Sequence, residues 1–169
     1  MTAIRAGIIT VSTRGAAGER ADESGPAMRE ALVGAGHEVI ASALVADEVA
    51  QVANAIIDAI RSGANVVLTS GGTGLSPNDV TPEATRRVID REVPGIAEAL
   101  RARSLAKTPH GMLSRGVAGA IGATLVVNLP GSPRAVRESL EVLLPVLPHA
   151  IELLGGESGE TGHATGRSA

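Results

Sequence analysis

Short apolar runs rich in β-branched residues alternate with segments of helical period along this chain, and no other feature restricts the fold as much. The runs predict strands over residues 6–11, 38–45, 65–69 and 124–128. Strands that alternate with helices are joined by crossover connections, which favour parallel pairing. The sequence therefore predicts an α/β fold with a mostly parallel sheet.

Helices are expected between the strands: after Ser24-Gly25-Pro26, over 48–62 and over 96–103. Another is expected to begin at Thr81, whose side chain can cap the helix ahead of Pro82 at the first helical position.

A last helix is expected after Ser132-Pro133. Its apolar residues recur at the three- and four-residue steps of one helix face, namely Val136, Leu140, Leu143, Leu144, Leu147, Ile151 and Leu154. We interpret this stripe as core or subunit contact rather than a membrane surface. Because Pro145 and Pro148 each remove an internal hydrogen bond, a kink or break is expected there.

Length and composition indicate a single domain over residues 1–154, since 169 residues is near the usual size of one domain. Residues 155–169 are rich in Gly, Ser, Thr and Glu without an apolar period, so we expect a disordered tail. No apolar run approaches the roughly 20 residues that cross a bilayer, and no secretion signal is recognisable. A cytoplasmic protein without membrane contact is the resulting expectation.

The chain contains no Phe, Tyr or Trp, and its formal net charge is −3. Binders of single-stranded nucleic acid gain about 1–3 kcal/mol for each base stacked on an aromatic ring, and phosphate-backbone binders need massed basic residues. A nucleic-acid partner is therefore not indicated. The absence of Cys excludes a thiol nucleophile and a thiolate zinc site.

Polar clusters follow the predicted strands at the point where each strand ends. Ser12-Thr13-Arg14 follows the first strand, Asp47 the second, 70–79 the third and 128–132 the last. In open parallel α/β sheets the ligand crevice lies beyond the carboxyl ends of the strands. We therefore expect these four clusters to converge on one edge of the sheet.

The richest cluster is Gly71-Gly72-Thr73-Gly74 followed by Asp79, between a predicted strand and a predicted helix. Glycines allow positive φ and close approach of a ligand, and successive N–H groups ahead of a helix can bind an anion. A flexible connection is the simpler alternative, but it would not need so many glycines, hydroxyls and acids. The loop lacks the Gly-Lys-Ser/Thr ending of a P-loop and does not match Gly-x-Gly-x-x-Gly, so kinase-like and dinucleotide sites are not indicated.

Together with Asp-Val-Thr-Pro-Glu-Ala-Thr at 79–85, this glycine run resembles the Mog/MoaB family of molybdenum-cofactor biosynthesis proteins. The similarity continues through 12–14, 45–48, 113–116 and 128–133, and so covers nearly the whole chain outside the tail. It implies a three-layer α/β/α subunit, a homotrimer, and a molybdopterin adenylyltransferase that joins AMP from ATP to molybdopterin and releases pyrophosphate. Mg²⁺ is the implied metal, and hand-over of the product to a molybdenum insertase is an implied partnership.

By this resemblance Asp47 and Asp79 are the catalytic acids and the Mg²⁺ ligands. A metal has a physical purpose there, because two anionic groups about 4 Å apart repel by roughly 4 kcal/mol at an effective dielectric of 20. The resemblance assigns ligand binding to Ser12, Arg14, Ser70, Gly71, Gly72, Thr73, Gly74, Ser76, Thr81, Ser114, Arg115, Asn128, Pro130, Gly131 and Ser132. Of these, Ser114-Arg115 and 128–132 would line the pterin side.

Plainer roles stand beside these assignments. Asp47 could cap the helix that follows it, Asp79 could support its turn, and 128–132 could supply turn chemistry with Ser132 as a cap. Many relatives carry an acid where this chain has Thr13, a departure that bears on how the first loop holds metal or nucleotide. A family member that binds molybdopterin without catalysis is the alternative function. The related domain of competence-damage proteins fits the short chain and the Asp-Val-Thr-Pro-Glu run less well.

Overall fold

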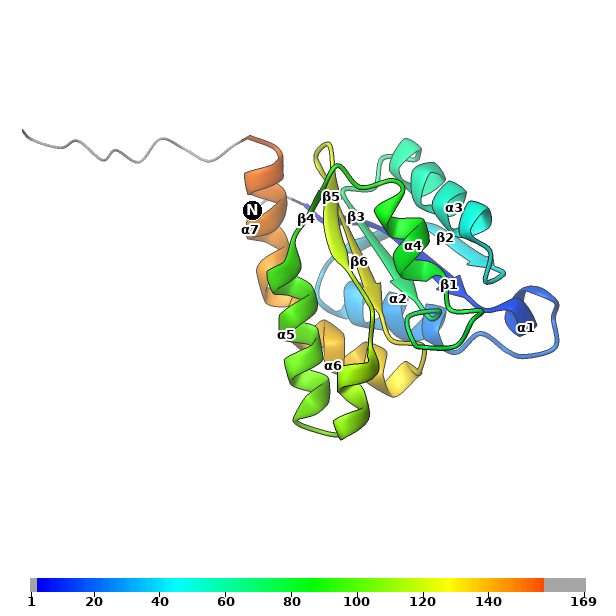
Figure 1. Ribbon diagram of the computed structural model, residues 1–169. Coiled ribbons are helices and arrows are strands. Elements are labelled where there is room, and N and C mark those ends of the chain that lie inside the picture. The colour runs from blue at the N-terminus through cyan, green and yellow to red at the C-terminus, as the bar shows by residue number, and fades with distance from the viewer. Residues whose placement is uncertain (1–2, 157–169) are drawn as a thin grey trace, which may run out of the picture.

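A computed structural model describes residues 3–156, which contain one six-stranded sheet in the order β2-β1-β3-β6-β5-β4 (Figure 1). The parallel strands are β1 (Arg5–Val11), β2 (Glu38–Val45), β3 (Val66–Ser70) and β6 (Thr124–Leu129). Beyond them β5 (Ala118–Ile121) is antiparallel to β6, and β4 (Arg91–Glu92) is antiparallel to β5. The four predicted strands and the mostly parallel sheet are confirmed.

Helices cover both faces of the sheet, which confirms the α/β/α layers (Figure 1). One face packs against α2 (Ser24–Gly34), α5 (Pro94–Leu105), α6 (Pro133–Leu143) and α7 (Leu147–Leu154), and the other against α3 (Val49–Arg61) and α4 (Thr81–Arg86). The remaining elements within residues 3–156 are α1 (Thr13–Ala16) and two 3₁₀ helices, η1 (Pro109–Leu113) and η2 (Leu144–Val146).

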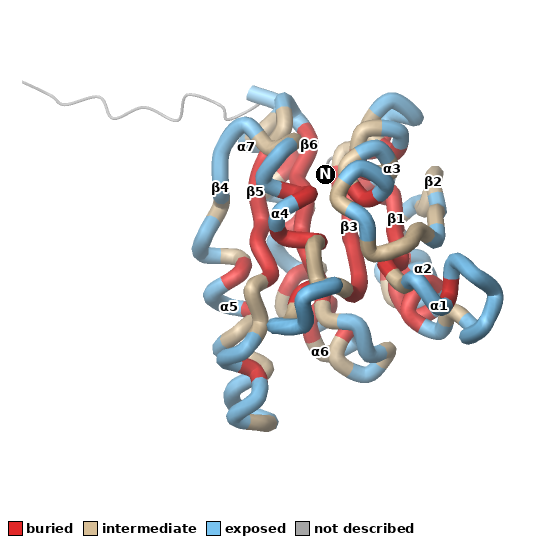
Figure 2. Tube along the Cα trace, turned by 45° about the vertical axis from the view of Figure 1, so that its right-hand side comes forward, coloured by how far each residue is buried: buried red, intermediate tan, exposed pale blue. Residues whose placement is uncertain are grey.

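The central strands β1, β3 and β6 are buried along almost their whole length (Figure 2), and the core on both of their faces is built from aliphatic side chains. Ile8 and Ile9 are neighbours on β1 that point to opposite faces, because successive side chains of a strand alternate. Ile8 shares its cluster with Leu140 of α6, and Ile9 shares its cluster with Ile56 of α3. Each fully buried aliphatic side chain contributes about 1.5–3 kcal/mol, so a core without aromatic rings is feasible.

The predicted last helix is interrupted at Pro145, as expected. α6 ends at Leu143, η2 follows, and Pro148 lies in the first turn of α7, where the missing N–H has no intrahelical partner to lose. The stripe faces the core, since Val136, Leu140, Leu143, Leu147 and Ile151 are all buried.

Four short elements were not predicted: α1, β4, η1 and β5, which have four, two, five and four residues. Segments this short display too little of a period to be recognised. Most of the predicted tail, 157–169, lies outside the described residues. No helix of the described part of the chain has the length and apolar character of a membrane span.

Candidate functional site

Two cavities lie where the parallel strands end, on either side of residues 71–80, which we call the glycine loop. The acidic cavity measures about 390 Å³ and is lined by four acids, Asp22, Glu23, Asp47 and Asp79. The α5 cavity measures about 260 Å³ and lies between the glycine loop, α5 and η1. The switch point of the sheet is between β1 and β3, beside the acidic cavity, because the chain turns to β2 on one side and to β3 on the other.

The structure divides the predicted site residues between these cavities. Ser12, Asp47, Ser70, Gly71, Gly72, Asp79, Gly131 and Ser132 line the acidic cavity. Thr73, Gly74, Ser114, Asn128 and Pro130 line the α5 cavity. Arg14, Ser76, Thr81 and Arg115 line neither of the two. The polar clusters that follow the parallel strands thus meet at one edge of the sheet, as predicted, and the glycine loop separates two compartments there.

Two glycines of positive φ shape the loop, Gly71 at 99° and Gly72 at 65°. A Cβ at Gly71 would collide with the carbonyl oxygen of Val11 at the end of β1. A Cβ at Gly72 would collide with the Thr81 hydroxyl and lie 3.2 Å from Asp47 Oδ1. The loop therefore passes so close to β1 and Asp47 that only glycine fits at both positions.

The loop offers backbone donors to a ligand. Gly71 N donates to Leu129 O at 3.3 Å, but the N–H groups of Gly72, Thr73 and Gly74 make no hydrogen bond within residues 3–156. Adjacent unpaired N–H groups form a concavity that favours anions. The next residue, Leu75, is 64% exposed.

Hydroxyl groups tie the loop to its surroundings. Ser70 Oγ donates to Pro130 O at 2.8 Å, and Thr81 Oγ1 donates to Gly71 O at 2.9 Å. Thr81 is the first residue of α4 and Val80 occupies the N-cap position, so the expected Thr81 cap is wrong. The buried hydroxyl is used to hold the glycine loop instead.

Asp47 is held by the loop that follows β1. Its Oδ2 accepts hydrogen bonds from the backbone N and from Oγ1 of Thr13, each at 2.8 Å. Its own backbone N donates to Thr13 Oγ1 at 3.0 Å. Glu48 is the N-cap residue of α3, so the plainer assignment of Asp47 as that cap is wrong. Within residues 3–156, Oδ1 of Asp47 has no hydrogen-bond partner.

Asp79 is held within its own turn, where Oδ2 accepts a hydrogen bond from Ser76 N at 2.9 Å and Oδ1 has no partner in the described residues. The acidic cavity thus presents two carboxylates, each with one oxygen held and one free. That donor set fits Mg²⁺, which is bound by one or two carboxylates and keeps waters and substrate phosphates in its remaining positions. Residues 3–156 contain no cluster of three or more metal-ligand side chains.

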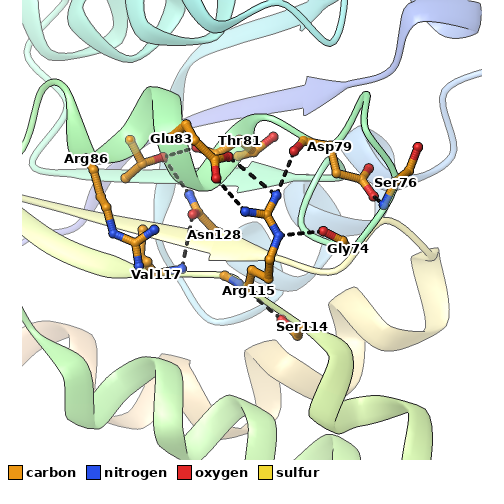
Figure 3. A network of polar contacts seen from close by, with 12 residues as sticks. Gly74, Ser76, Asp79, Thr81, Glu83, Arg86, Ser114, Arg115, Val117 and Asn128 are labelled. Atoms are coloured by element: carbon orange, nitrogen blue, oxygen red, sulfur yellow. Dashed lines mark hydrogen bonds and ion pairs between the residues drawn. The ribbon is translucent and has the colours of Figure 1, made fainter.

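Arg115 braces the glycine loop (Figure 3). Its Nε donates to Gly74 O at 2.7 Å, Nη2 donates to Asp79 O at 2.7 Å, and Nη1 forms an ion pair with Glu83. Its backbone N donates to Thr73 O at 2.8 Å. The hydrogen bond from Arg115 lowers the pKa of the Glu83 carboxyl below its ordinary 4.5. The guanidinium is therefore committed to loop and helix rather than to a ligand in either cavity.

Asn128 belongs to the framework although it borders the α5 cavity. Its Nδ2 donates to the hydroxyls of Thr69 at 2.9 Å and Thr85 at 2.8 Å, and its Oδ1 accepts from Val117 N at 3.1 Å. Both amide hydrogens are engaged, so the side chain has no donor left for a pterin.

The serines show similar local uses. Ser132 Oγ accepts from Ala135 N at 3.2 Å and caps α6, which confirms the plainer role given to it. Ser12 Oγ accepts from Gly15 N at 3.0 Å and caps α1. Among the other predicted residues outside both cavities, Arg14 pairs with Glu19 on the surface at 3.9 Å.

Arg20, Asp22 and Ser24 line the acidic cavity but were not predicted. Asp22 Oδ1 accepts from the N–H groups of Ser24 and Gly25 at 3.0 and 2.9 Å, and so fixes the start of α2. Arg20 is the only cationic side chain among the described residues of this cavity, and it makes no ion pair within 3–156. A lone arginine in a loop carries no spacing signal; only its closeness to the end of the first strand could have marked it.

Comparison with known proteins places these features in a family. Residues 7–149 match the family described as "probable molybdopterin binding domain". A molybdopterin adenylyltransferase from Helicobacter pylori is 36% identical over 163 residues, covering 92% of this chain and 90% of that protein. The crystal structure of the molybdopterin biosynthesis enzyme MoaB from Thermus thermophilus has a TM-score of 0.84 at 55% identity, over 90% of this chain and 97% of that one.

Several curated relatives are longer than this chain. The molybdenum cofactor synthesis protein cinnamon from Drosophila melanogaster is 39% identical over 163 residues, which is 93% of this chain but 26% of that protein. For four such relatives, the chain spans 22% to 50% of the relative's length.

Proposed function

The chain belongs to the molybdopterin binding domain family, and we propose that it is a molybdopterin adenylyltransferase of molybdenum-cofactor biosynthesis. In this role it transfers AMP from MgATP to the terminal phosphate of molybdopterin. The observation that carries the proposal is the acidic cavity, where Asp47 and Asp79 each present a free oxygen beside unpaired N–H groups of the glycine loop.

In the proposed reaction a terminal phosphate oxygen of molybdopterin attacks the α-phosphorus of ATP. A new oxygen–phosphorus bond forms, the bond from the α-phosphorus to the bridging oxygen breaks, and pyrophosphate leaves with that electron pair. No residue forms a covalent intermediate. The chain contributes positioning and electrostatic stabilisation, as is usual for transfer at phosphorus.

We assign the residues to these tasks by compartment. Asp47 and Asp79 would hold Mg²⁺, which would supply positive charge to neutralise the phosphates. The N–H group of Gly72 donates to phosphate oxygens in the acidic cavity, and those of Thr73 and Gly74 donate from the side of the α5 cavity. Arg20 contacts the polyphosphate as a cationic side chain of the acidic cavity. Mixed polar and apolar groups of the α5 cavity, Ser114 and Pro130 among them, receive the pterin.

We also propose a homotrimer that hands its product to a molybdenum insertase. An apolar groove between α5 and α7, lined by Ile96, Val146 and Leu153 among others, supports a contact between subunits. Several relatives contain a further region beside the one that matches this chain, and this supports the proposal that a second protein or domain receives the product. Light scattering of the purified chain should give three times the 17.0 kDa of one subunit.

The direct test incubates purified protein with MgATP and molybdopterin and detects adenylylated pterin and pyrophosphate by mass spectrometry. Asp47→Asn and Asp79→Asn should each lower the rate by about 100-fold or more, because each removes a carboxylate charge that holds the Mg²⁺ needed to offset the phosphates. Asp58→Asn is the matched control, since Asp58 lies on α3 and pairs with Arg61 away from both cavities. Pterin binding without any adenylylated product would instead favour the binding-only family member.

A further inference from the structure

We propose that Thr13 is a positioning residue: it orients Asp47 so that Oδ1 binds a divalent cation together with nucleotide in the acidic cavity. This inference rests on the proposed function, because it concerns the metal that the reaction uses. Thr13, which stands where many relatives carry an acid, thereby has a definite physical role.

The two residues are joined by three hydrogen bonds across 34 positions of sequence. Thr13 donates twice to Asp47 Oδ2, from its backbone N and from Oγ1, and Oγ1 also accepts from Asp47 N. The terminal torsion of an aspartate is broad and roughly two-fold, so nothing intrinsic to the side chain selects one orientation. The pair of donors selects it, because Oδ2 is then saturated and Oδ1 is left beside Gly72.

The surroundings of Thr13 are themselves fixed. Ser12 N donates to Val45 O at 2.8 Å, which ties the end of β1 to the end of β2, and Ser12 Oγ caps α1. Thr13 is the first residue of α1 and therefore sits on a braced turn rather than on a free loop. The position of Asp47 therefore depends on how β1 and β2 are paired.

The chemistry of position 13 follows from this geometry. A hydroxyl can donate and accept at once, as this arrangement requires. An ionised acid can only accept and would place a like charge against Asp47 Oδ2. Valine keeps the branched shape of threonine but offers no donor, and serine keeps the donor.

The test measures Mn²⁺ affinity by electron paramagnetic resonance, with and without α,β-methylene-ATP as the nucleotide probe. Thr13→Val should weaken Mn²⁺ binding in the presence of the analogue by about tenfold, since losing a residue that orients a metal ligand typically costs 10- to 100-fold. Thr13→Ser should restore affinity. In an Asp47→Asn background, Thr13→Val should have no further effect, because Thr13 acts only through that carboxylate.

Thr124→Val is the control, since it removes a threonine hydroxyl that donates to Ala64 O at the opposite end of the sheet. The proposal is overturned if Thr13→Val binds Mn²⁺ like wild type, if Thr124→Val weakens binding equally, or if serine fails to rescue. Additive losses in the double variant would also contradict it. If wild-type protein binds no Mn²⁺ with the analogue, the proposed function is at fault, whereas tight wild-type binding with an unaffected valine variant overturns the role of Thr13 alone.

Discussion

The two aspartates of the acidic cavity are held in contrasting ways. Asp79 is fixed within its own turn by Ser76 N, and its loop is braced from outside by Arg115. Asp47 depends on Thr13, 34 residues away, and on the paired ends of β1 and β2. One carboxylate is thus positioned by local turn chemistry, and the other by the register of the sheet.

This contrast separates two ways of damaging one site. A change at the brace of the glycine loop should affect Asp79 and leave the Asp47 pair intact, whereas a change between β1 and β2 should do the reverse. Gly72 lies next to both regions. Its neighbours are Thr81, whose hydroxyl holds the glycine loop, and Asp47 itself.

Gly72→Ala should therefore have the largest effect. Alanine at position 72 would have to adopt the positive φ of the loop, which costs roughly 1–2 kcal/mol. Its Cβ would also collide with Thr81 and crowd Asp47 Oδ1. Displacement of reacting groups by about 1 Å can cost 100-fold, so a fall in adenylyl transfer of about that size is expected. Gly34→Ala, at the end of α2, is the control, since its Cβ would meet nothing within 4 Å. A Gly72→Ala protein with half the wild-type rate would contradict the close approach.

Arg115→Ala should damage the Asp79 side alone. The Arg115 side chain is 33% exposed and donates to two backbone carbonyls and to Glu83, so losing these charge-assisted bonds should lower the stability of the fold. The melting temperature should fall by about 4–8 °C. Amide hydrogen exchange should quicken at 72–79 but not at 12–13 or 46–47. Equal quickening at both places would mean that the two supports are not independent.

Arg20→Ala tests the one cationic side chain among the described residues that line the acidic cavity. If the unpaired guanidinium contacts the polyphosphate, KM for ATP should rise about tenfold and inhibition by pyrophosphate should weaken in parallel. Steady-state kinetics measures both quantities. Arg61→Ala, at the end of α3 and outside the cavity, supplies the control. Unchanged constants in Arg20→Ala would remove this residue from the phosphate site.

The pH dependence of the brace should be the smallest effect. The folded-state pKa of Glu83 is lowered by Arg115, so the stabilisation is present above the ordinary value of 4.5 and is lost as pH falls through the lowered value. Because the Glu83 side chain is 46% exposed, the gain over Glu83→Gln should stay below about 1 kcal/mol. Melting curves of the two proteins should differ at pH 7 and approach each other as the pH falls below 4.5. A gap that widens in acid would give the opposite sign.

Sequence reasoning succeeded where the determinant is local or periodic. Alternating strand and helix periods yield the parallel sheet, and a parallel sheet brings Asp47, Asp79 and the glycine run to one edge whatever the loops do in detail. The break at Pro145 likewise follows from a missing N–H within the residue itself.

The sequence did not predict hydrogen bonds between side chains and partners that lie far away along the chain. Arg115 lies 41 residues from Gly74, and Asn128 lies 43 residues from Thr85, so neither commitment is visible in spacing. Thr81 has the sequence context of a helix cap, yet its hydroxyl donates to the carbonyl oxygen of Gly71, ten residues earlier. The division into two cavities has the same origin, since it depends on how the glycine loop folds between β1 and α5.

The exposed position of Leu75 beside the glycine loop has a practical consequence. Because the chain contains no Phe, Tyr or Trp, it has no intrinsic ultraviolet fluorescence. Leu75 is 64% exposed, and substitutions at such surface positions usually change stability by no more than about 0.5 kcal/mol. Leu75→Trp would therefore place a single emitter at the wall between the two compartments, and its spectrum would follow nucleotide and pterin arrival without background from the rest of the molecule.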